Sequence, residues 1–319
     1  MHSKVAASDF SISASHVDEV FESEGDAQSE HGSNDAQGEH APRNARKLAA
    51  LEELLRSYGS VAIGFSGGVD STFLATVAAR TLPRNRVLLI HVDSPFVGTP
   101  EQSSFEREAG RLGLPLARIA VDPLSVPAVA ANPHDRCYHC KQAVFSTIIA
   151  EAQRRGIAVV ADGSNASDVG DYRPGMRAVE EMGVRSPLME TGWDKTEERE
   201  LLRAWGCAVW DLPAGACMAT RVPCGEQLTP EKLDTIRACE DYLHERGLKQ
   251  VRVRLDDGVA RVSAAREDLA LLARQTAGAA EGSIALSDDI IQALMARGAR
   301  RVEPTATLYQ HGEMSHPAA

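Results

Sequence analysis

The chain has 319 residues, 43% of them hydrophobic and 25% charged, which is typical of a globular protein with one large or two modest domains. Its mean hydropathy is -0.23, and no apolar run approaches the roughly 18–20 residues of a membrane span, so we exclude an integral membrane protein. The net charge of -11 is opposite to the balance usual in proteins that bind nucleic acids through broad contacts. The segment MHSKVAASDFSISASH has no continuous apolar region, so we expect no secretory signal.

Residues 1–42 are poor in large apolar side chains and rich in Ser, Glu, Asp, Gly and His. Such a segment buries too little surface to offset the entropy lost on ordering, so we expect a disordered acidic tail. Order is predicted to begin near Pro42 with a helix, because Leu51 and Leu55 belong to a pattern with helical spacing. Gly59 stands where this helix should end.

Between residues 61 and 164, short apolar runs alternate with helical patterns. The predicted strands are VAIGF (61–65), RVLLIHVDS (86–94), LARIAVD (116–122) and IAVVADGS (157–164). Helices are expected directly after the first strand, over about 101–112 and over about 140–155. Continuous apolar strands that alternate with helices indicate a parallel sheet covered on both faces. The fold class is therefore α/β, in a domain predicted over residues 43–225.

The character of the sequence changes near Gly225. The stretch TPEKLDTIRACEDYLHERG reads as an amphipathic helix, and VRVRLDD and GVARVSA read as two short strands joined at a Gly turn. Two helices, over about 266–274 and 286–298, and a last strand over 301–308 complete a small α+β domain predicted for residues 226–319.

The strongest motif is Ser66-Gly67-Gly68-Val69-Asp70-Ser71, between the first predicted strand and its helix. The glycines allow a tight turn that presents bare N–H groups, and the helix N-terminus adds its partial positive charge. The loop follows the carboxyl end of a strand, where open α/β sheets bind ligands. Ser66 and Ser71 add hydroxyl donors, and Asp70 is expected to cap the helix or to hold Mg²⁺ through water. This pattern predicts a phosphate site that is neither a Lys-containing P-loop nor a GxGxxG turn.

The SGGVDS motif resembles the pyrophosphate loop of the PP-loop ATPases, also called N-type ATP pyrophosphatases. The resemblance implies a Rossmann-like domain that cleaves ATP to AMP and pyrophosphate while it adenylates a substrate. It implies that the loop binds ATP, with His91 at the adenine; a buried core histidine with satisfied nitrogens is the alternative interpretation of His91. We assign Asp162 and Asn165, in ADGSN at the end of the strand 157–164, to the same nucleotide site.

Further motifs follow in a fixed order along the chain: RCYHCK (136–141), ADGSN (161–165), KTEER (195–199), PAGACMATRVPCG (213–225) and RVR (252–254). This order resembles the LarE family, the ATP-dependent sulfur transferases that help to make the nickel-pincer nucleotide cofactor of lactate racemase. The resemblance extends over about 43–265. It implies a pyridinium biscarboxylate mononucleotide as substrate, and homo-oligomers whose subunits surround it.

Four of the six cysteines have the spacing of a ligand set. Cys137 and Cys140 form a C-x-x-C pair, and Cys217 and Cys224 flank a second loop. All four could hold a structural Zn²⁺ ion, or three of them could hold a [4Fe–4S] cluster with one iron open to an extra sulfide. The third alternative is that the thiols are unconnected. The two remaining cysteines lie in apolar patterns and are predicted to pack in the core: Cys207 and Cys239.

Cys217 follows a loop rich in Pro, Gly and Ala and stands shortly before Arg221. A nearby guanidinium lowers the pKa of a thiol and favours the reactive thiolate, so both residues are predicted to be catalytic. The LarE resemblance assigns Cys217 the role of sulfur donor. In one version of the family the cysteine gives up its own sulfur, as a carbon–sulfur lyase. In the cysteine-rich version, which this chain resembles, three cysteines hold a cluster that supplies sulfide.

Arg252 and Arg254 alternate with Val251 and Val253, so both guanidiniums should point to one face of a strand. Two guanidiniums on one face suit a phosphate, because Arg forms bidentate pairs with its oxygens. A solvated strand face is the alternative interpretation. The LarE resemblance favours the phosphate of the substrate, with Arg261 on the neighbouring strand as a third ligand.

We therefore predict a cytoplasmic ATP-dependent sulfur transferase that acts on a small-molecule nucleotide, forms homo-oligomers and binds neither membrane nor nucleic acid. ATP would adenylate a carboxylate, and sulfur at Cys217 would then displace AMP to give a thiocarboxylate. The expected cofactors are ATP, Mg²⁺ and, in the cysteine-rich version, a [4Fe–4S] cluster. Two other functions stay open: a tRNA thiolation enzyme built on the same loop, and a zinc-stapled nucleotide-binding module without catalysis.

Overall fold

The computed structural model describes residues 35–168, 174–213, 215–272 and 283–310. The chain divides into two units, Met1–Arg43 and Asn44–Ala319, and both sheets belong to the second. Helix α1 (Asp35–Tyr58) spans the boundary and begins before Pro42, so the predicted start was too late. The remainder of the predicted tail, residues 1–34, lies outside the described residues.

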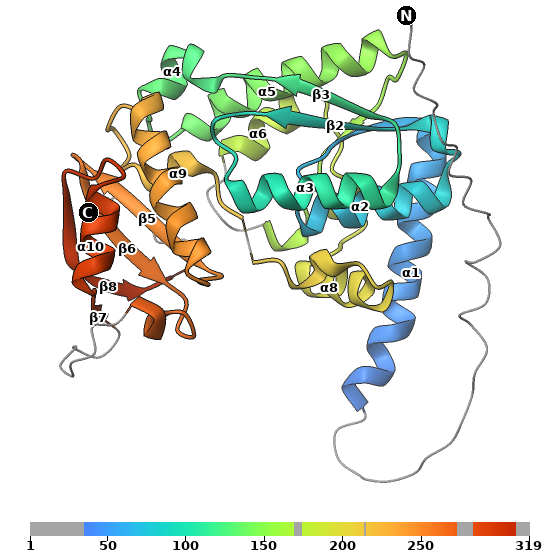
Figure 1. Cartoon of the computed structure of the whole chain (residues 1–319). Helices are drawn as coiled ribbons and strands as arrows, with labels where there is room; N and C mark the ends of the chain where they lie inside the picture. The colour runs from blue at the N-terminus through green and yellow to red at the C-terminus, as the bar shows by residue number, and fades with distance from the viewer. Residues whose placement is uncertain (1–34, 169–173, 214, 273–282, 311–319) are drawn as a thin grey trace, which may run out of the picture. The chain divides into compact units, whose positions relative to one another are not determined.

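The first sheet is parallel throughout, in the order β3-β2-β1-β4 (Figure 1). Its strands are β1 (Val61–Gly64), β2 (Val87–Asp93), β3 (Leu116–Ala120) and β4 (Val160–Ala161). Strand β4 is shorter than the predicted 157–164, because it pairs with β1 at two positions only, Ala62 with Val160 and Ile63 with Ala161. The predicted α/β class is confirmed.

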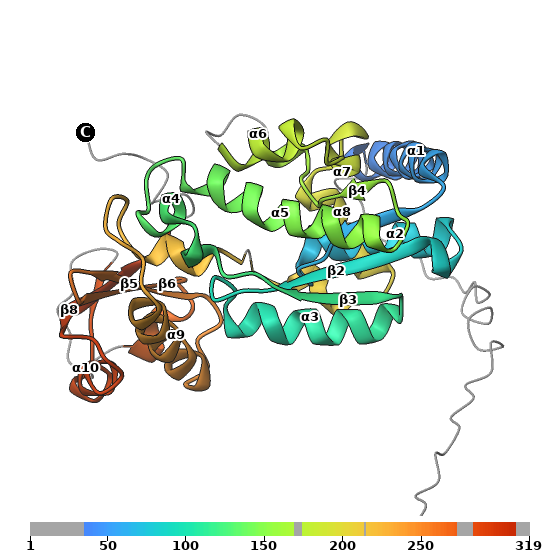
Figure 2. The ribbon, with the colours of Figure 1, turned by 90° about the horizontal axis from the view of Figure 1, so that it is seen from above.

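Both faces of this sheet are buried, which explains why its strands read as continuous apolar runs. Val61 and Ile63 of β1 face one hydrophobic cluster, and Ala62 faces another. The first cluster is covered by α1, α2 (Val69–Thr81), α3 (Thr99–Leu112) and α8 (Lys195–Ala204). The second is covered by α5 (Arg136–Arg154) and α6 (Pro174–Glu181). Figure 2 shows α3 and α5 on opposite sides of β2 and β3. Short helices also occur in the loops: α4 (Pro127–Ala130) and α7 (Pro187–Glu190).

The second sheet is mixed, in the order β5-β6-β8-β7, as seen in Figure 1. Pairs β5–β6 and β7–β8 are antiparallel, whereas β6–β8 is parallel. The elements are α9 (Pro230–Glu245), β5 (Val251–Asp256), β6 (Val259–Ala264), β7 (Ser283–Ala285), α10 (Asp288–Met295) and β8 (Arg301–Leu308). Helices α9 and α10 share one hydrophobic cluster with the sheet. The division between the predicted domains, at residue 225, stays a prediction.

Two sequence expectations in this region need correction. Within the predicted helix 266–274, the described residues form only a 3-10 turn, Leu269–Leu272. The buried Asp268 carboxylate accepts the backbone N–H groups of Lys249 and Gln250 at 2.9 and 2.7 Å, so this segment is tied to the start of β5. Strand β7 was not predicted, because three residues are too few for a periodic signal.

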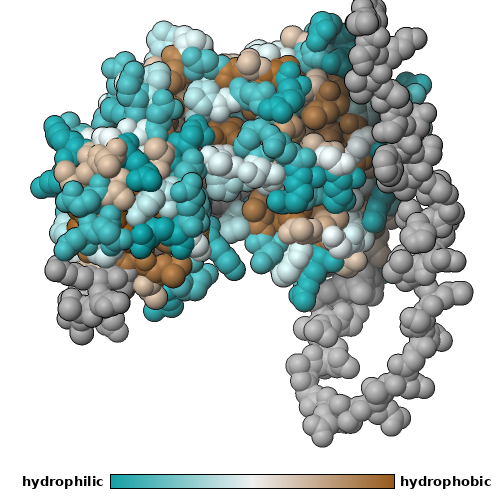
Figure 3. All heavy atoms as spheres, viewed as in Figure 1, coloured by the Kyte–Doolittle hydropathy of each residue, from teal (hydrophilic) through white to brown (hydrophobic). Residues whose placement is uncertain are grey.

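None of the described helices is long and apolar enough to cross a membrane. On the face shown in Figure 3, hydrophilic side chains are interspersed with smaller hydrophobic patches. This mixed surface is ordinary for a globular protein, because there is not enough polar surface to cover the molecule.

Candidate functional site

A cavity of about 830 Å³ opens at the carboxyl ends of β1 and β2 and reaches strand β5 of the second sheet. The loop between β1 and α2 forms one part of its wall, and three cysteines form another. Two arginines of β5 complete it. Motifs that lie far apart in the sequence therefore share one cavity.

The loop Ser66–Ser71 has the geometry of an anion cradle. Gly67 has φ +75°, and a Cβ atom there would lie 2.3 Å from Phe105 Cα, so only glycine fits. Gly68 is the N-cap of α2 and provides no side-chain cap. Ser66 Oγ lies 3.1 Å from Ser71 Oγ and accepts the Gly68 N–H at 3.3 Å. The N-cap residue Gly68 therefore has no side chain that could occupy the first N–H groups of α2. Phosphate binding at a helix N-terminus requires such unoccupied N–H groups.

The carboxylate of Asp70 is held in place by polar side chains of Lys195 and Asn165. Its Oδ2 lies 3.3 Å from Lys195 Nζ, and its Oδ1 lies 3.4 Å from Asn165 Nδ2. Asn165 also donates to Glu198 Oε1 at 3.0 Å. Burial, together with the neighbouring Asp70 charge, raises the pKa of Glu198 to about 10. Asn165, predicted to contact the nucleotide, is thus buried and orients Asp70.

Asp162 lines the cavity, but its carboxylate is engaged by neighbouring serines. It accepts Ser164 Oγ at 2.6 Å and Ser186 Oγ at 2.7 Å. Next to it, Gly163 lies directly against the first turn of α2, because a Cβ there would be 3.0 Å from the Ser71 nitrogen. The ADGSN motif therefore supports the loop Ser66–Ser71, called the phosphate loop below, by close packing.

His91 is buried in the wall of the cavity, and both of its ring nitrogens have neighbours. Nδ1 donates to the Phe65 carbonyl at 2.9 Å, and Nε2 lies 3.3 Å from Gln102 Oε1. The ring stacks on Phe105 with centroids 3.4 Å apart. These contacts favour the interpretation of His91 as a satisfied core histidine, so its imidazole offers little to a nucleotide.

Three of the four predicted ligand cysteines line the cavity. Cys137 and Cys140 lie on the first two turns of α5, and Cys217 lies on the loop before the short 3-10 helix Met218–Arg221. Cys224 is exposed and lies apart from this wall, with its Sγ 3.4 Å from the Asn132 carbonyl. The structure thus singles out a set of three.

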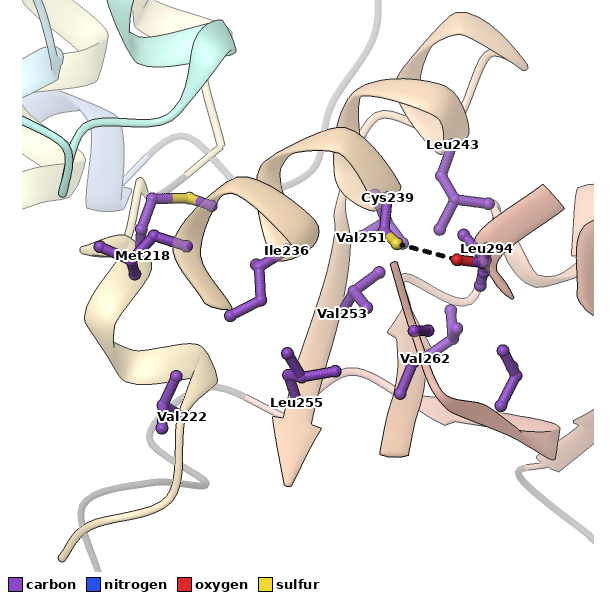
Figure 4. Packing of buried hydrophobic residues seen from close by; sticks show 14 of the residues in the cluster. Met218, Val222, Ile236, Cys239, Leu243, Val251, Val253, Leu255, Val262 and Leu294 are labelled. Atoms are coloured by element: carbon purple, nitrogen blue, oxygen red, sulfur yellow. Dashed lines mark hydrogen bonds between the residues drawn. The ribbon is translucent and has the colours of Figure 1, made fainter. Parts of the chain in front are cut away.

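The two cysteines predicted to pack in the core are both buried, Cys207 at 1% and Cys239 at 0% exposure. Figure 4 shows the Cys239 side chain pointing from α9 toward Leu294, whose carbonyl lies 3.7 Å from the thiol sulfur.

The segment around Cys217 is anchored by its neighbours. Met218 and Val222 point into the cluster formed by α9 and β5, beside Ile236 and Leu255 (Figure 4). Cys217 itself is exposed toward the cavity. A fixed backbone therefore presents a free thiol to the cavity.

The thiol pKa values differ from the sequence expectation. Burial, together with the nearby Cys217 and Cys137, raises the pKa of Cys140 to about 12. Although Cys217 is accessible from the cavity, desolvation by the protein around its sulfur raises its pKa and outweighs the lowering effects of Arg136 and Arg221. The expectation that Arg221 leaves Cys217 with a depressed pKa was wrong, because the surrounding protein penalises the thiolate more than the guanidiniums favour it.

Arg221 is already engaged within the protein. Its Nε and Nη2 pair with the two carboxylate oxygens of Glu240 at 3.0 and 3.1 Å. Its Nη1 donates to the Ala216 and Cys217 carbonyls at 2.6 and 2.9 Å. Arg221 therefore fixes the backbone of the loop that carries Cys217.

Arg136 is a cavity residue to which sequence reasoning gave no role. It is 8% exposed, and its Nη1 donates to Asn132 Oδ1 at 2.7 Å and to the Ala219 carbonyl at 3.0 Å. Its Nη2 lies 3.5 Å from Cys137 Sγ. The RCYHCK motif contains Arg136, but nothing in its spacing distinguishes a buried guanidinium from a solvated one.

Arg252 and Arg254 both line the cavity, while Val251 and Val253 are buried behind them, as the alternation predicts. Arg252 is 7% exposed, and burial lowers its pKa, with Arg221 adding to this effect. Arg261 lies opposite Arg254 on the neighbouring strand, but its exposed side chain pairs with Asp256 at 2.7 Å and does not line the cavity.

The donor set suits the groups that the sequence implies. Gly67 leaves a cradle that a Cβ would fill, which fits a phosphate. Three cysteine sulfurs on one wall are the ligand type of an iron–sulfur cluster, whose irons each take one thiolate. Among the described residues, no group of three or more His, Cys, Asp or Glu side chains is arranged around a single metal ion.

Together, the fold and the cavity define a Rossmann-like α/β protein whose ligand site lies at the carboxyl end of a parallel sheet. No protein-family model matches the chain. Three curated proteins are similar to it. An uncharacterized protein of Synechocystis is 37% identical over 223 residues, covering 70% of this chain and 83% of its own length.

The pyridinium-3,5-bisthiocarboxylic acid mononucleotide synthase of Lactiplantibacillus plantarum is 33% identical over 222 residues, 70% of this chain and 79% of that protein. An uncharacterized protein of Methanocaldococcus jannaschii is 26% identical over 212 residues, 66% of this chain and 80% of that protein. The chain belongs to the family of this synthase, the LarE family.

Proposed function

We propose that this protein is an ATP-dependent sulfur transferase that converts carboxylates of pyridinium-3,5-biscarboxylic acid mononucleotide into thiocarboxylates. The named relative makes the corresponding bisthiocarboxylic acid. The observation that carries the proposal is the single cavity shared by the phosphate loop, three cysteines and two arginines. A reaction that first adenylates a carboxylate and then transfers sulfur to it needs the ATP phosphates and the sulfur donor within reach of one bound substrate.

The first half-reaction uses the loop between β1 and α2. A carboxylate oxygen of the substrate bonds to the α-phosphorus of ATP, and pyrophosphate leaves with the electron pair of the broken P–O bond. The N-terminus of α2 favours the negative charge that develops on pyrophosphate. Asp70 is the candidate for holding Mg²⁺, and Asn165 and Lys195 fix its carboxylate.

The second half-reaction uses the cysteine wall, which is the part of the cavity lined by Cys137, Cys140 and Cys217. A sulfur nucleophile bonds to the acyl carbon, and AMP leaves as the C–O bond to the phosphate breaks. Cys217 is the candidate nucleophile, because it is exposed to the cavity on an anchored loop. The thioester formed on Cys217 would release the thiocarboxylate by β-elimination, in which the Cα proton is lost to a base, the Cβ–S bond breaks and dehydroalanine stays in the chain. In the cysteine-rich version, Cys137, Cys140 and Cys217 would hold a [4Fe–4S] cluster, which supplies sulfide when bound.

The arginines of β5 provide the end of the cavity that would hold the phosphate of the substrate. Their guanidiniums are fixed by neighbours, since Arg252 donates to the Val251 carbonyl at 2.8 Å and Arg254 to Ser263 Oγ at 2.9 Å. Anchoring the phosphate there would fix the distance from the substrate ring to the loop and to the cysteines.

The direct test is to incubate anaerobically purified protein with ATP, Mg²⁺ and the biscarboxylate mononucleotide. We expect AMP and pyrophosphate in equal amounts, and a product whose mass reflects replacement of oxygen by sulfur. Pyrophosphate release without any sulfur product, in protein loaded with iron and sulfide, would contradict the proposal. Colourless protein with one equivalent of zinc and no AMP formation would favour the zinc-stapled module, and thiolation of tRNA would favour the other PP-loop enzyme.

A further inference from the structure

The polar side chains of Asn132 and Arg136 join the two segments that carry the cavity cysteines. Asn132 is 1% exposed and has φ +54°, which is unusual for a residue other than glycine. Its Nδ2 donates to the Val222 and Pro223 carbonyls at 3.3 and 2.8 Å. Its Oδ1 accepts from Arg136 Nη1 at 2.7 Å.

Arg136 continues this connection toward the sulfur atoms. The same Nη1 donates to the Ala219 carbonyl at 3.0 Å, two residues after Cys217. Its Nη2 lies 3.5 Å from Cys137 Sγ. One guanidinium therefore touches both the N-terminus of α5 and the cysteine loop.

The charge of Arg136 is buried without a carboxylate. In the described part of the chain, no Asp or Glu forms an ion pair with it, and the side chains within its hydrogen-bond reach are Asn132 and Cys137. A buried guanidinium without a counter-ion is costly, so a position of this kind is suited to a site that receives negative charge. The N-terminus of α5 adds its own partial positive charge at the same place.

We infer that Asn132 and Arg136 form a clamp that builds the sulfur site: they hold the Cys217 loop against the start of α5 and supply the fixed cation beside its three sulfurs. The inference rests on the proposed function. Arg136 is a positioning residue in this arrangement, because it acts through the cysteines. Arg221, which shares its charge with Glu240, cannot take this place.

The test is proximity cross-linking of the reduced, metal-free full chain with a short bifunctional thiol reagent, in a Cys207→Ala background. Trypsin should release residues 137–141 and 204–221 as separate peptides, with 119–141 in place of 137–141 in Arg136→Met, and a cross-link to Cys217 joins the two. Arg136→Met and Asn132→Gly should each lower the yield of this joined peptide by about tenfold, the effect of losing about 1.4 kcal/mol of positioning. Asn132→Gly keeps the positive φ, so it removes the side-chain bonds without straining the backbone.

Arg84→Met is the matched control, because Arg84 also donates to two backbone carbonyls, those of Leu112 and Gly113, and none of these residues lines the cavity. It should cross-link like the unaltered chain. Sulfur transfer should fall in both clamp variants, while substrate-dependent pyrophosphate release persists. Unchanged cross-linking in both variants would overturn the clamp. Because cross-linking needs no substrate, it decides the clamp even if the chain proves inactive on the biscarboxylate mononucleotide.

Discussion

At the scale of single residues, Gly67 is the position where the structure leaves least room. Gly67→Ala combines a left-handed backbone with a Cβ 2.3 Å from Phe105 Cα, so it should lower the free energy of unfolding by about 2 kcal/mol or more. Gly68→Ala is the matched control, since its Cβ would meet only Ser66 Oγ at 3.4 Å. Urea unfolding of the two variants would compare them directly. Equal stability would show that the loop relaxes freely and is no rigid cradle.

Gly68→Asp tests binding at the same loop without loss of the fold. Gly68 is the N-cap of α2 with extended backbone, and Asp is a favoured N-cap residue, so the helix should tolerate it. The new carboxylate would take the helix N–H groups and repel phosphate. ATP affinity, measured by calorimetry, should therefore fall by at least about tenfold, or about 1.4 kcal/mol. Unchanged affinity would rule out this loop as the ATP site.

At the scale of elements, helix α8 carries a buried acid that makes stability depend on pH. Glu198 has a pKa of about 10 in the fold, against an ordinary value of 4.5, because it is buried beside the Asp70 carboxylate. Between these values the folded chain keeps a proton that the unfolded chain has lost. Glu198 therefore makes the free energy of unfolding fall as pH rises through this window, by at most about 1.4 kcal/mol per pH unit.

Glu198→Gln should remove this dependence, because the amide keeps an acceptor for Asn165 and carries no charge. We expect the variant to gain stability over the unaltered chain at pH 9 and to gain little at pH 5, in urea unfolding at both values. Glu190→Gln, at an exposed ion pair with Arg185, is the control and should show no such trend. A constant difference between Glu198→Gln and the unaltered chain at both pH values would mean that Glu198 is ionised in the fold.

Strand β5 presents its arginines to the cavity as a pair, and this arrangement has a kinetic consequence. Loss of one Arg–phosphate hydrogen-bonded pair costs roughly 1.5–3 kcal/mol. Arg252→Ala and Arg254→Ala should therefore raise KM for the mononucleotide and leave ATP affinity unchanged. Arg261→Ala should leave both unchanged, because Arg261 pairs with Asp256 outside the cavity. If all three variants match the unaltered chain, the phosphate binds elsewhere.

At the scale of the whole molecule, the loop Ser66–Ser71 and the three cysteines are different residues in the wall of one cavity, so the two half-reactions should be separable by mutation. Cys217→Ala should abolish sulfur transfer and retain substrate-dependent pyrophosphate release, measured in the same reaction. Cys140→Ala should behave likewise and lose bound iron if a cluster is the donor. Sulfur transfer that persists in Cys217→Ala would refute its assignment.

Cys224 distinguishes the possible donor sets, because it lies outside the cysteine wall. Iron content and transfer that survive Cys224→Ala would support Cys137, Cys140 and Cys217 as the three ligands. Transfer that depends on Cys217 alone would indicate the sacrificial version. Mass spectrometry would then find the protein about 34 Da lighter after reaction, the mass of H₂S lost when the C–S bond breaks.

The sequence by itself determined the local elements of this protein. Continuous apolar runs between helices are enough to define a parallel sheet, and the SGGVDS turn defines its anion loop, because both depend on residues close together in the chain. The alternation around Arg252 and Arg254 likewise fixes which side chains share a face. Strand β8 has the predicted bounds, 301–308, for the same reason.

Only the tertiary structure decided which of these elements meet. Asp70 contacts Lys195, 125 residues further along, and Arg136 contacts the Ala219 carbonyl at a separation of 83 residues. Local pattern carries no information about such contacts, because they arise from the packing of helices on both faces of the sheet. Burial is likewise a tertiary property. It makes Glu198 a neutral acid beside Asp70, and the protein packed around the Cys217 sulfur raises the pKa of this thiol beside two guanidiniums.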